Sequence, residues 1–125
     1  MNTPKDLRYA KTHEWAKKEG KNIRIGITDH AQHEITDVVH VELPAKGKKV
    51  EKGQPCTVVE SVKSAFDIYA PVSGTIVETN AKLDSNPELV NQSPYGEGYF
   101  VVIEASNIAE YDAMMSPEEY EKSLK

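Results

Sequence analysis

The apolar residues of this chain recur mostly with the two-residue period of β-strands. Between Lys21 and Ile27, isoleucines alternate with polar or small residues, which predicts a half-buried strand. Further strands are expected over short apolar and β-branched runs, namely 37–42, 55–60, 65–69, 75–79 and 99–104. The pattern therefore predicts a mainly β structure.

Helical signals are short and lie outside these runs. A helix opening with a capping threonine is expected over 28–32. The sequence Ser-Pro-Glu-Glu at 116–119 places a capping hydroxyl, a proline and a returning glutamate in the order of a helix start. We therefore expect a helix over 117–124, with another over 108–115, whereas turn signals predict a long irregular connection over 81–98.

Two stretches, 41–53 and 68–80, resemble each other. Matching positions carry the same residue type, as in the pairs Pro44 and Pro71, Gly47 and Gly74, Val50 and Val77, and Glu51 and Glu78. Two similar strand–turn–strand units predict a small β structure with internal two-fold pseudosymmetry. Gly74 is expected at a positive φ in its turn, since glycine adopts that conformation without strain.

Lys63 lies between the two copies, where two apolar runs meet, and is the strongest candidate for chemistry. Its neighbours Val62, Ser64 and Ala65 are small or uncharged. A lysine on a rigid hairpin tip is suited to acylation, because its ε-amine is exposed to a ligase and a stiff base aims the attached arm. Lysine amines are mostly protonated at neutral pH, so an enzyme has to supply the activated acyl donor. An ordinary surface lysine is the competing interpretation.

Length and composition narrow the function classes. The 125 residues, 38% of them apolar, suffice for one thin core, and a net charge of −5 argues against a nucleic-acid partner. No apolar run approaches the length of a membrane span. The N-terminal residues lack a signal or transit pattern, so we expect a cytoplasmic protein, or a mitochondrial one only in a processed form. Cys56 is the one cysteine, which excludes an intrachain disulfide and suits a small buried side chain.

Several separated blocks of the chain match one known family. Around Lys63 these are 60–65 and 67–74, and elsewhere they are 13–15, 26–32, 41–44, 86–91 and 94–98. Together they resemble, almost from end to end, the glycine cleavage system H protein family of lipoyl carriers. Lipoyl domains of 2-oxoacid dehydrogenases usually carry Asp-Lys-Ala at the tip and biotin carriers Met-Lys-Met, whereas this chain carries Val-Lys-Ser.

The resemblance implies a fold for the whole chain. We expect residues 1–125 to form a single lipoyl-carrier domain of mainly β class. The family fold is the biotinyl/lipoyl-carrier barrel-sandwich hybrid, in which two small sheets pack face to face, with short peripheral helices and a C-terminal helix.

The resemblance also implies a cofactor and partners. Lipoate would be attached to Lys63 in amide linkage by a lipoate ligase or a lipoyl/octanoyl transferase. The arm would take an aminomethyl group from glycine at a pyridoxal-phosphate glycine decarboxylase and deliver it to a folate-dependent aminomethyltransferase. A dihydrolipoamide dehydrogenase would then reoxidise the arm. The chain itself would be a non-catalytic carrier, because the reacting sulfurs belong to the cofactor.

In this family the loaded arm folds back into a surface cleft. Glu14 and Asp67 are the candidate polar contacts there, since a cationic aminomethyl group favours a nearby carboxylate. The alternatives are an exposed surface carboxylate for Glu14 and a cross-strand or turn hydrogen bond for Asp67. The chain departs from the family over 33–36, where Glu34 stands in place of a cleft histidine found in some members and His33 lies beside it.

Other functions compete with this interpretation. An H-like protein can relay lipoyl or octanoyl groups to other lipoyl domains, and an unmodified scaffold of the same fold is a further alternative. An enzyme is disfavoured, because no nucleophile and base stand in a recognisable pattern. His30 and His33 fit one helix face, but two imidazoles need a further ligand, so no metal site is expected.

Overall fold

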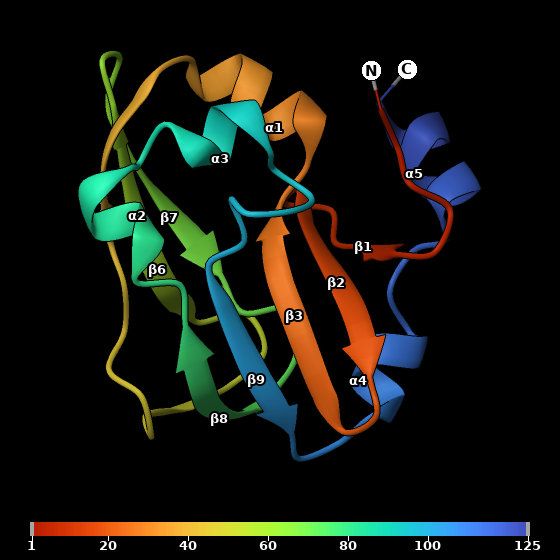
Figure 1. Cartoon of the computed structure of the whole chain (residues 1–125). Helices are drawn as coiled ribbons and strands as arrows, with labels where there is room; N and C mark the ends of the chain where they lie inside the picture. Colours follow the sequence, from red (N-terminus) through yellow and green to blue (C-terminus); the bar gives the residue numbers. More distant parts are fainter. Residues whose placement is uncertain (1, 125) are drawn as a thin grey trace.

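In the computed structural model, which describes residues 2–124, the strands form two antiparallel sheets (Figure 1). The six-stranded sheet has the spatial order β1 (Arg8–Tyr9), β2 (Glu14–Glu19), β3 (Asn22–Ile27), β9 (Val101–Ala105), β8 (Gly74–Thr79) and β5 (Lys49–Val50). The three-stranded sheet has the order β4 (Val38–Glu42), β6 (Pro55–Ser61) and β7 (Ala65–Tyr69). The expected mainly β fold of two small packed sheets is confirmed.

The core lies between the two sheets. Ile23, Ile25 and Ile27 of β3 are buried, as their alternation predicted. They belong to one apolar cluster with Val59 of β6 and Ile68 of β7, which come from the other sheet. Burial of such side chains is the main favourable contribution to folding, so the sheets are held together chiefly through this layer.

Short helices cover the ends and flanks of the sheets (Figure 1). They are α1 (Asp29–Ile35), α2 (Lys82–Ser85), α3 (Leu89–Gln92), α4 (Ala109–Asp112) and α5 (Pro117–Ser123). The helix predicted over 28–32 extends to Ile35, and α5 begins with the predicted capping box between Ser116 and Glu119. The connection expected to be irregular contains α2 and α3. None of the helices formed by residues 2–124 has the length and apolar character needed to cross a bilayer.

The sequence repeat corresponds to two similar crossings between the sheets. The first copy leads from β4 to β5 and the second from β7 to β8, each passing from the three-stranded to the six-stranded sheet. The crossings meet where Gly47 N donates to Ile76 O at 2.7 Å. Gly74 has φ 159°, close to ordinary extended backbone, so the expected positive-φ turn is not its main constraint. Instead, a Cβ at Gly74 would lie 2.0 Å from Glu104 O.

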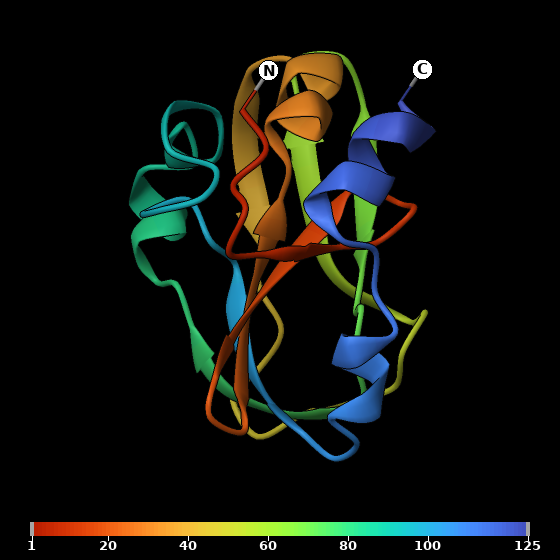
Figure 2. The same ribbon diagram turned by 90° about the vertical axis from the view of Figure 1, so that its right-hand side faces the viewer.

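The N-terminal strands β1 and β2 were not predicted. Trp15 of β2 is fully buried and lies opposite Gly26 of β3, where a larger residue would collide with the indole ring. Tyr9 of β1 stacks on Tyr120 of α5 with ring centroids 4.8 Å apart. Figure 2 shows α5 lying against this N-terminal region. These aromatic contacts bring the two ends of the chain together at one flank of the larger sheet.

Candidate functional site

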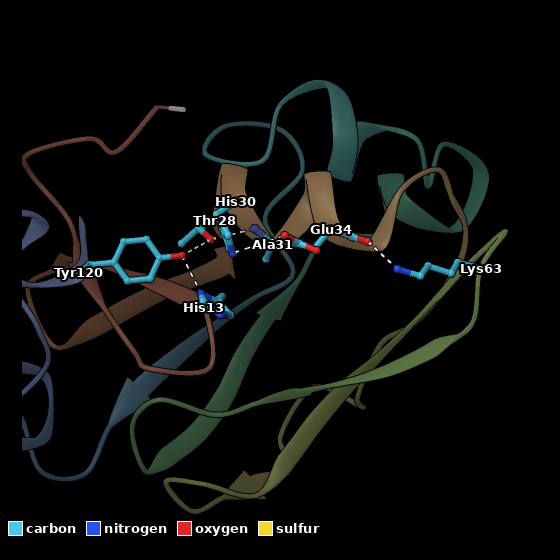
Figure 3. A network of polar contacts seen from close by, with 7 residues as sticks. All are labelled: His13, Thr28, His30, Ala31, Glu34, Lys63 and Tyr120. Atoms are coloured by element: carbon cyan, nitrogen blue, oxygen red, sulfur yellow. Dashed lines mark hydrogen bonds and ion pairs between the residues drawn. The ribbon is translucent and has the colours of Figure 1, made fainter. Parts of the chain in front are cut away.

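Lys63 lies in the turn between β6 and β7, at the tip of a hairpin that projects at the upper left of Figure 1. Its side chain is exposed. Nζ donates to the carbonyl oxygen of Glu34 at 3.4 Å, near the C-terminal end of α1 (Figure 3). The contact of the amine is thus a backbone carbonyl rather than a carboxylate, and the nitrogen is accessible to another protein.

The backbone at Lys63 is fixed by hydrogen bonds within the turn. The Ser61 hydroxyl accepts hydrogen bonds from Lys63 N at 3.1 Å and from Ser64 N at 3.2 Å. Ser61 N donates to Ser64 O at 2.8 Å. From outside the turn, Asp37 O accepts from Val62 N at 2.9 Å. Serine is favoured in turns because its hydroxyl bonds to the backbone nearby, so the sequence could have pointed to Ser61 but not to Asp37.

Helix α1, which meets Lys63 at one end, is anchored at the other end by α5 (Figure 3). The Thr28 hydroxyl accepts from Ala31 N and caps α1. The Tyr120 hydroxyl lies 2.7 Å from the Thr28 hydroxyl and 2.8 Å from His13 Nδ1. Burial, followed by the neighbouring ring of His30, lowers the pKa of His13. The helix beside the lysine is therefore fixed from the opposite side of the molecule.

Glu14 is buried, with only 1% of its surface exposed, so the alternative of an exposed surface carboxylate is wrong. Its Oε2 accepts from Tyr69 N at 3.2 Å, and its Oε1 accepts from the Thr12 hydroxyl. Burial raises the pKa of Glu14 to about 7, outweighing these two hydrogen bonds, which lower it. The carboxylate thus lies at a site that penalises its negative charge.

A cavity of about 310 Å³ adjoins Glu14. It is bounded by the N-terminal segment, by the end of β7 at Tyr69 and by Met114 and Met115 after α4. Most of the side chains at this cavity are apolar, and the charged residues among them are Glu14, Lys11 and Lys52. Such a lining suits a ligand with an apolar body and a polar or charged end.

Asp67 lies on β7 between the lysine turn and the Glu14 cavity. Its side chain is exposed, and it is paired with Val58 across the strands. The four steps from Ala65 to Tyr69 cover about 14 Å at the usual strand rise. The lysine turn and Glu14 thus lie at opposite ends of β7, and Asp67 lies between them on the strand.

The histidines and the cysteine lie outside the lysine turn and the lining of the cavity. His30 lies against His13, with ring centroids 4.9 Å apart, and His30 Nε2 is 3.9 Å from the Glu34 carboxylate. Within residues 2–124, no group of three or more His, Cys, Asp or Glu side chains is placed to hold a metal ion. Cys56 is buried, as expected for a small core residue, and burial raises the pKa of its thiol to about 11.

Comparisons with known proteins show the family of the chain. The profile of the family described as "Glycine cleavage H-protein" matches residues 7–125. The glycine cleavage system H protein of Endomicrobium trichonymphae is 55% identical over 99% of this chain and 100% of its own length. That of Thermus thermophilus is 52% identical over 100% of this chain and 98% of its own length. The crystal structure of a glycine cleavage system H protein from Mycobacterium marinum superposes with a TM-score of 0.89 at 32% identity, covering 97% of this chain and 98% of that one. The chain therefore belongs to the glycine cleavage H-protein family.

Proposed function

We propose that this chain is a lipoyl carrier of glycine cleavage, with lipoate attached through an amide bond to Lys63. The observation that carries the proposal is the exposed Lys63 amine at the tip of a hairpin whose base is fixed by Ser61. The names of the relatives, which match over almost the whole chain, support the same role. On this proposal, residues 1–125 act as one carrier domain without catalytic side chains of their own.

The residues around Lys63 fit such an attachment. The amine contacts a carbonyl oxygen at 3.4 Å, a contact weak enough to be exchanged for solvent or for a ligase. When bound, lipoate supplies the sulfur chemistry that carries an aminomethyl group. The contribution of the chain is to hold the attachment point at a defined place, which raises the local concentration of the arm at each partner.

The cavity at the far end of β7 is the proposed resting place of a loaded arm. Glu14 would meet a cationic amino group there, and Asp67 would flank the arm on its way along β7. A cation beside Glu14 favours the ionised carboxyl group, so it would lower the raised pKa of Glu14. Burial would also keep water away from the labile group, which is useful for a carrier that moves between enzymes.

The proposed partners are the enzymes that attach the arm, load it, unload it and reoxidise it. They are a pyridoxal-phosphate glycine decarboxylase, a folate-dependent aminomethyltransferase, a dihydrolipoamide dehydrogenase and a lipoate ligase or lipoyl/octanoyl transferase. All of them need access to the same tip. The hairpin that bears Lys63 projects from the body of the protein, which supports a role in serving several active sites in turn (Figure 1).

Incubation with a lipoate ligase, lipoate and ATP tests the attachment. Peptide mass mapping should place one lipoyl group on Lys63, and the Lys63→Arg variant should gain none. Glycine cleavage in a mixture with the decarboxylase, the aminomethyltransferase and the dihydrolipoamide dehydrogenase should then depend on the modified chain. A chain that stays unmodified under conditions that lipoylate a known H protein would refute the proposal. Transfer of the group from the loaded chain to a separate lipoyl domain would identify the relay role.

A further inference from the structure

Asn91 lies on α3, yet its side chain bonds to the segment that joins α1 to β4. Its Oδ1 accepts from Val38 N at 2.8 Å. Its Nδ2 donates to Thr36 O at 2.8 Å and to the Gln32 side chain at 3.1 Å. An asparagine amide has two donor hydrogens and one acceptor oxygen, so both ends of this group are engaged with the same junction.

The junction held by Asn91 has an unfavourable backbone conformation. Thr36 has φ 65° and ψ −153°, a region that glycine adopts readily and a β-branched residue rarely does. Such a conformation persists only where surrounding contacts enforce it. The two shortest bonds of Asn91 reach Thr36 and Val38, the residues on either side of Asp37. Asn91 therefore fixes the peptide groups that flank Asp37.

The lysine turn touches this same junction. Asp37 O accepts from Val62 N at 2.9 Å, and Glu34 O accepts from Lys63 Nζ at 3.4 Å. Both contacts join the turn to the segment that begins at the end of α1 and leads into β4. The chain of contacts thus runs from the Asn91 amide to Asp37, and from Asp37 to the residue preceding Lys63.

We propose that Asn91 is a positioning residue for Lys63. It holds the junction of α1 and β4 in one conformation, and the junction in turn holds the lysine turn in one orientation. This explains why a side chain 53 residues from Val38 in sequence bonds to the backbone on both sides of Asp37. The part of the inference that concerns acylation depends on the proposed function, whereas the part that concerns the orientation of the turn does not.

Hydrogen exchange in the unmodified protein tests the structural part. In Asn91→Ala the protection factor of the Val62 amide should fall about tenfold, which is the effect of about one hydrogen bond. The protection factor of Ile103 in the larger sheet should change little. Asn86→Ala is the matched control, because Asn86 is exposed on the same connection and its side chain bonds only weakly to Ser85 at 3.4 Å. Unchanged Val62 protection in Asn91→Ala, or an equal loss in Asn86→Ala, would overturn the inference.

Asn91→Asp provides a second variant with a distinct readout. At neutral pH the introduced carboxylate can accept from Val38 N but cannot donate to Thr36 O. On acidification the protonated carboxyl group regains a donor, so the Val62 amide chemical shift should return toward that of the unsubstituted protein measured at the same pH. Asn91→Ala should show no such return. If the Val62 chemical shift does not respond to protonation in Asn91→Asp, then Asn91 does not hold the junction of α1 and β4. This outcome would count against the inference even if Asn91→Ala does not fold.

Ligation kinetics test the functional part. A lysine that is less well oriented should lower kcat of a lipoate ligase several-fold in Asn91→Ala and change KM little, because the chain still docks. Equal kcat for Asn91→Ala and Asn86→Ala would refute the positioning role. If the unsubstituted chain is not lipoylated at all while Val62 protection falls as expected, the proposed function fails and the positioning of the turn stands.

Discussion

The two ends of β7 hold charged groups in opposite surroundings. At one end the Lys63 amine is exposed, and its turn is held by backbone amides, the Ser61 hydroxyl and the Asp37 carbonyl. At the other end Glu14 is buried beside a cavity, and burial raises its pKa to about 7. One end therefore offers a charge to the outside, and the other keeps a charge in a site that disfavours it.

On the proposed function, the arm would be attached at the exposed end of β7 and its cargo would be protected at the buried end. An exposed amine loses no hydration, so the tip remains accessible to a modifying enzyme at little cost in folding free energy. A buried carboxylate without a cation destabilises the fold, and a cationic ligand would relieve that penalty. On the proposed function, the cationic group of a loaded arm would be that ligand.

The largest expected effect is a loss of function from a substitution at the hairpin tip. Lys63→Arg should abolish lipoylation and glycine cleavage, because the guanidinium group is not a nucleophile for the activated acyl group, while the fold stays intact. Intact mass after ligation and reconstituted turnover measure the loss, and circular dichroism with urea unfolding checks the fold. Retained turnover in Lys63→Arg would show that the arm is attached elsewhere.

Gly74→Val affects the pairing of β8 with β9 in the larger sheet, rather than either end of β7. A Cβ at Gly74 would lie 2.0 Å from Glu104 O and 2.8 Å from the Ile103 side chain, so β8 and β9 would have to separate. We expect a loss of about 3 kcal/mol or more in the free energy of unfolding, as for severe overpacking in a core. Urea unfolding measures it.

A glycine in open space is the matched control for this prediction. Gly20 has φ 69°, and no atom lies within 4 Å of the place that a methyl group would take there, so Gly20→Ala carries backbone strain without a collision. Its cost should be about 1 kcal/mol. A loss in Gly74→Val no larger than in Gly20→Ala would exclude the close approach of Glu104 as the reason for glycine at this position.

Local signals in the sequence predicted the parts of the molecule that depend on neighbours in the chain. The alternation at Ile23 to Ile27 is a property of one strand, and the capping box at Ser116 is contained in four residues, so both were found. Strand β2 was missed because its second half, Lys17 to Glu19, is exposed and charged, which hides the strand period. Its identity as a strand depends on pairing with β3.

The same distinction applies to the candidate site. The place of Lys63 at an exposed turn between two strands was predicted because the turn depends on local sequence, whereas its role as the attachment point stays a prediction. The burial of Glu14 depends on Tyr69, 55 residues away, and the role of Asn91 depends on Val38, 53 residues away. A single sequence contains no signal for contacts of that range. The cleft roles of Glu14 and Asp67 remain predictions.

Glu14→Gln tests the cavity alone. Because the pKa of Glu14 is raised from 4.5 to about 7 on folding, the folded state binds the proton more tightly, and stability should fall as pH rises between these values. Glutamine removes this penalty. The variant should therefore be more stable than the unsubstituted protein by about 3 kcal/mol above pH 7, at about 1.4 kcal/mol for each unit of pKa shift, and nearly equal to it near pH 4.5.

Urea unfolding at a series of pH values measures this difference. Asp67→Asn is the matched control, because Asp67 is an exposed carboxylate on the same strand, and its effect should stay within about 0.5 kcal/mol at every pH. If Glu14→Gln and Asp67→Asn give the same pH profile, then the contrast between a buried and an exposed carboxylate is wrong. The stabilised Glu14→Gln should also hold a loaded arm less well, which the hydrolysis rate of the aminomethyl group would report.

Ser61→Ala has the smallest expected effect and tests the tip for rigidity rather than for chemistry. The hydroxyl accepts from two backbone amides, Lys63 N and Ser64 N, and alanine would leave both to water. Since the turn is partly exposed, we expect a loss of about 1 kcal/mol in the free energy of unfolding, together with faster amide exchange at Lys63. Ser64→Ala removes a hydroxyl from the same turn while keeping the backbone bonds of Ser64, so it should be nearly neutral. Equal effects of the two variants on exchange at Lys63 would mean that the Ser61 hydroxyl does not fix the backbone at Lys63, and the orientation of the turn would then depend on its other bonds, from Ser61 N to Ser64 O and from Val62 N to Asp37 O.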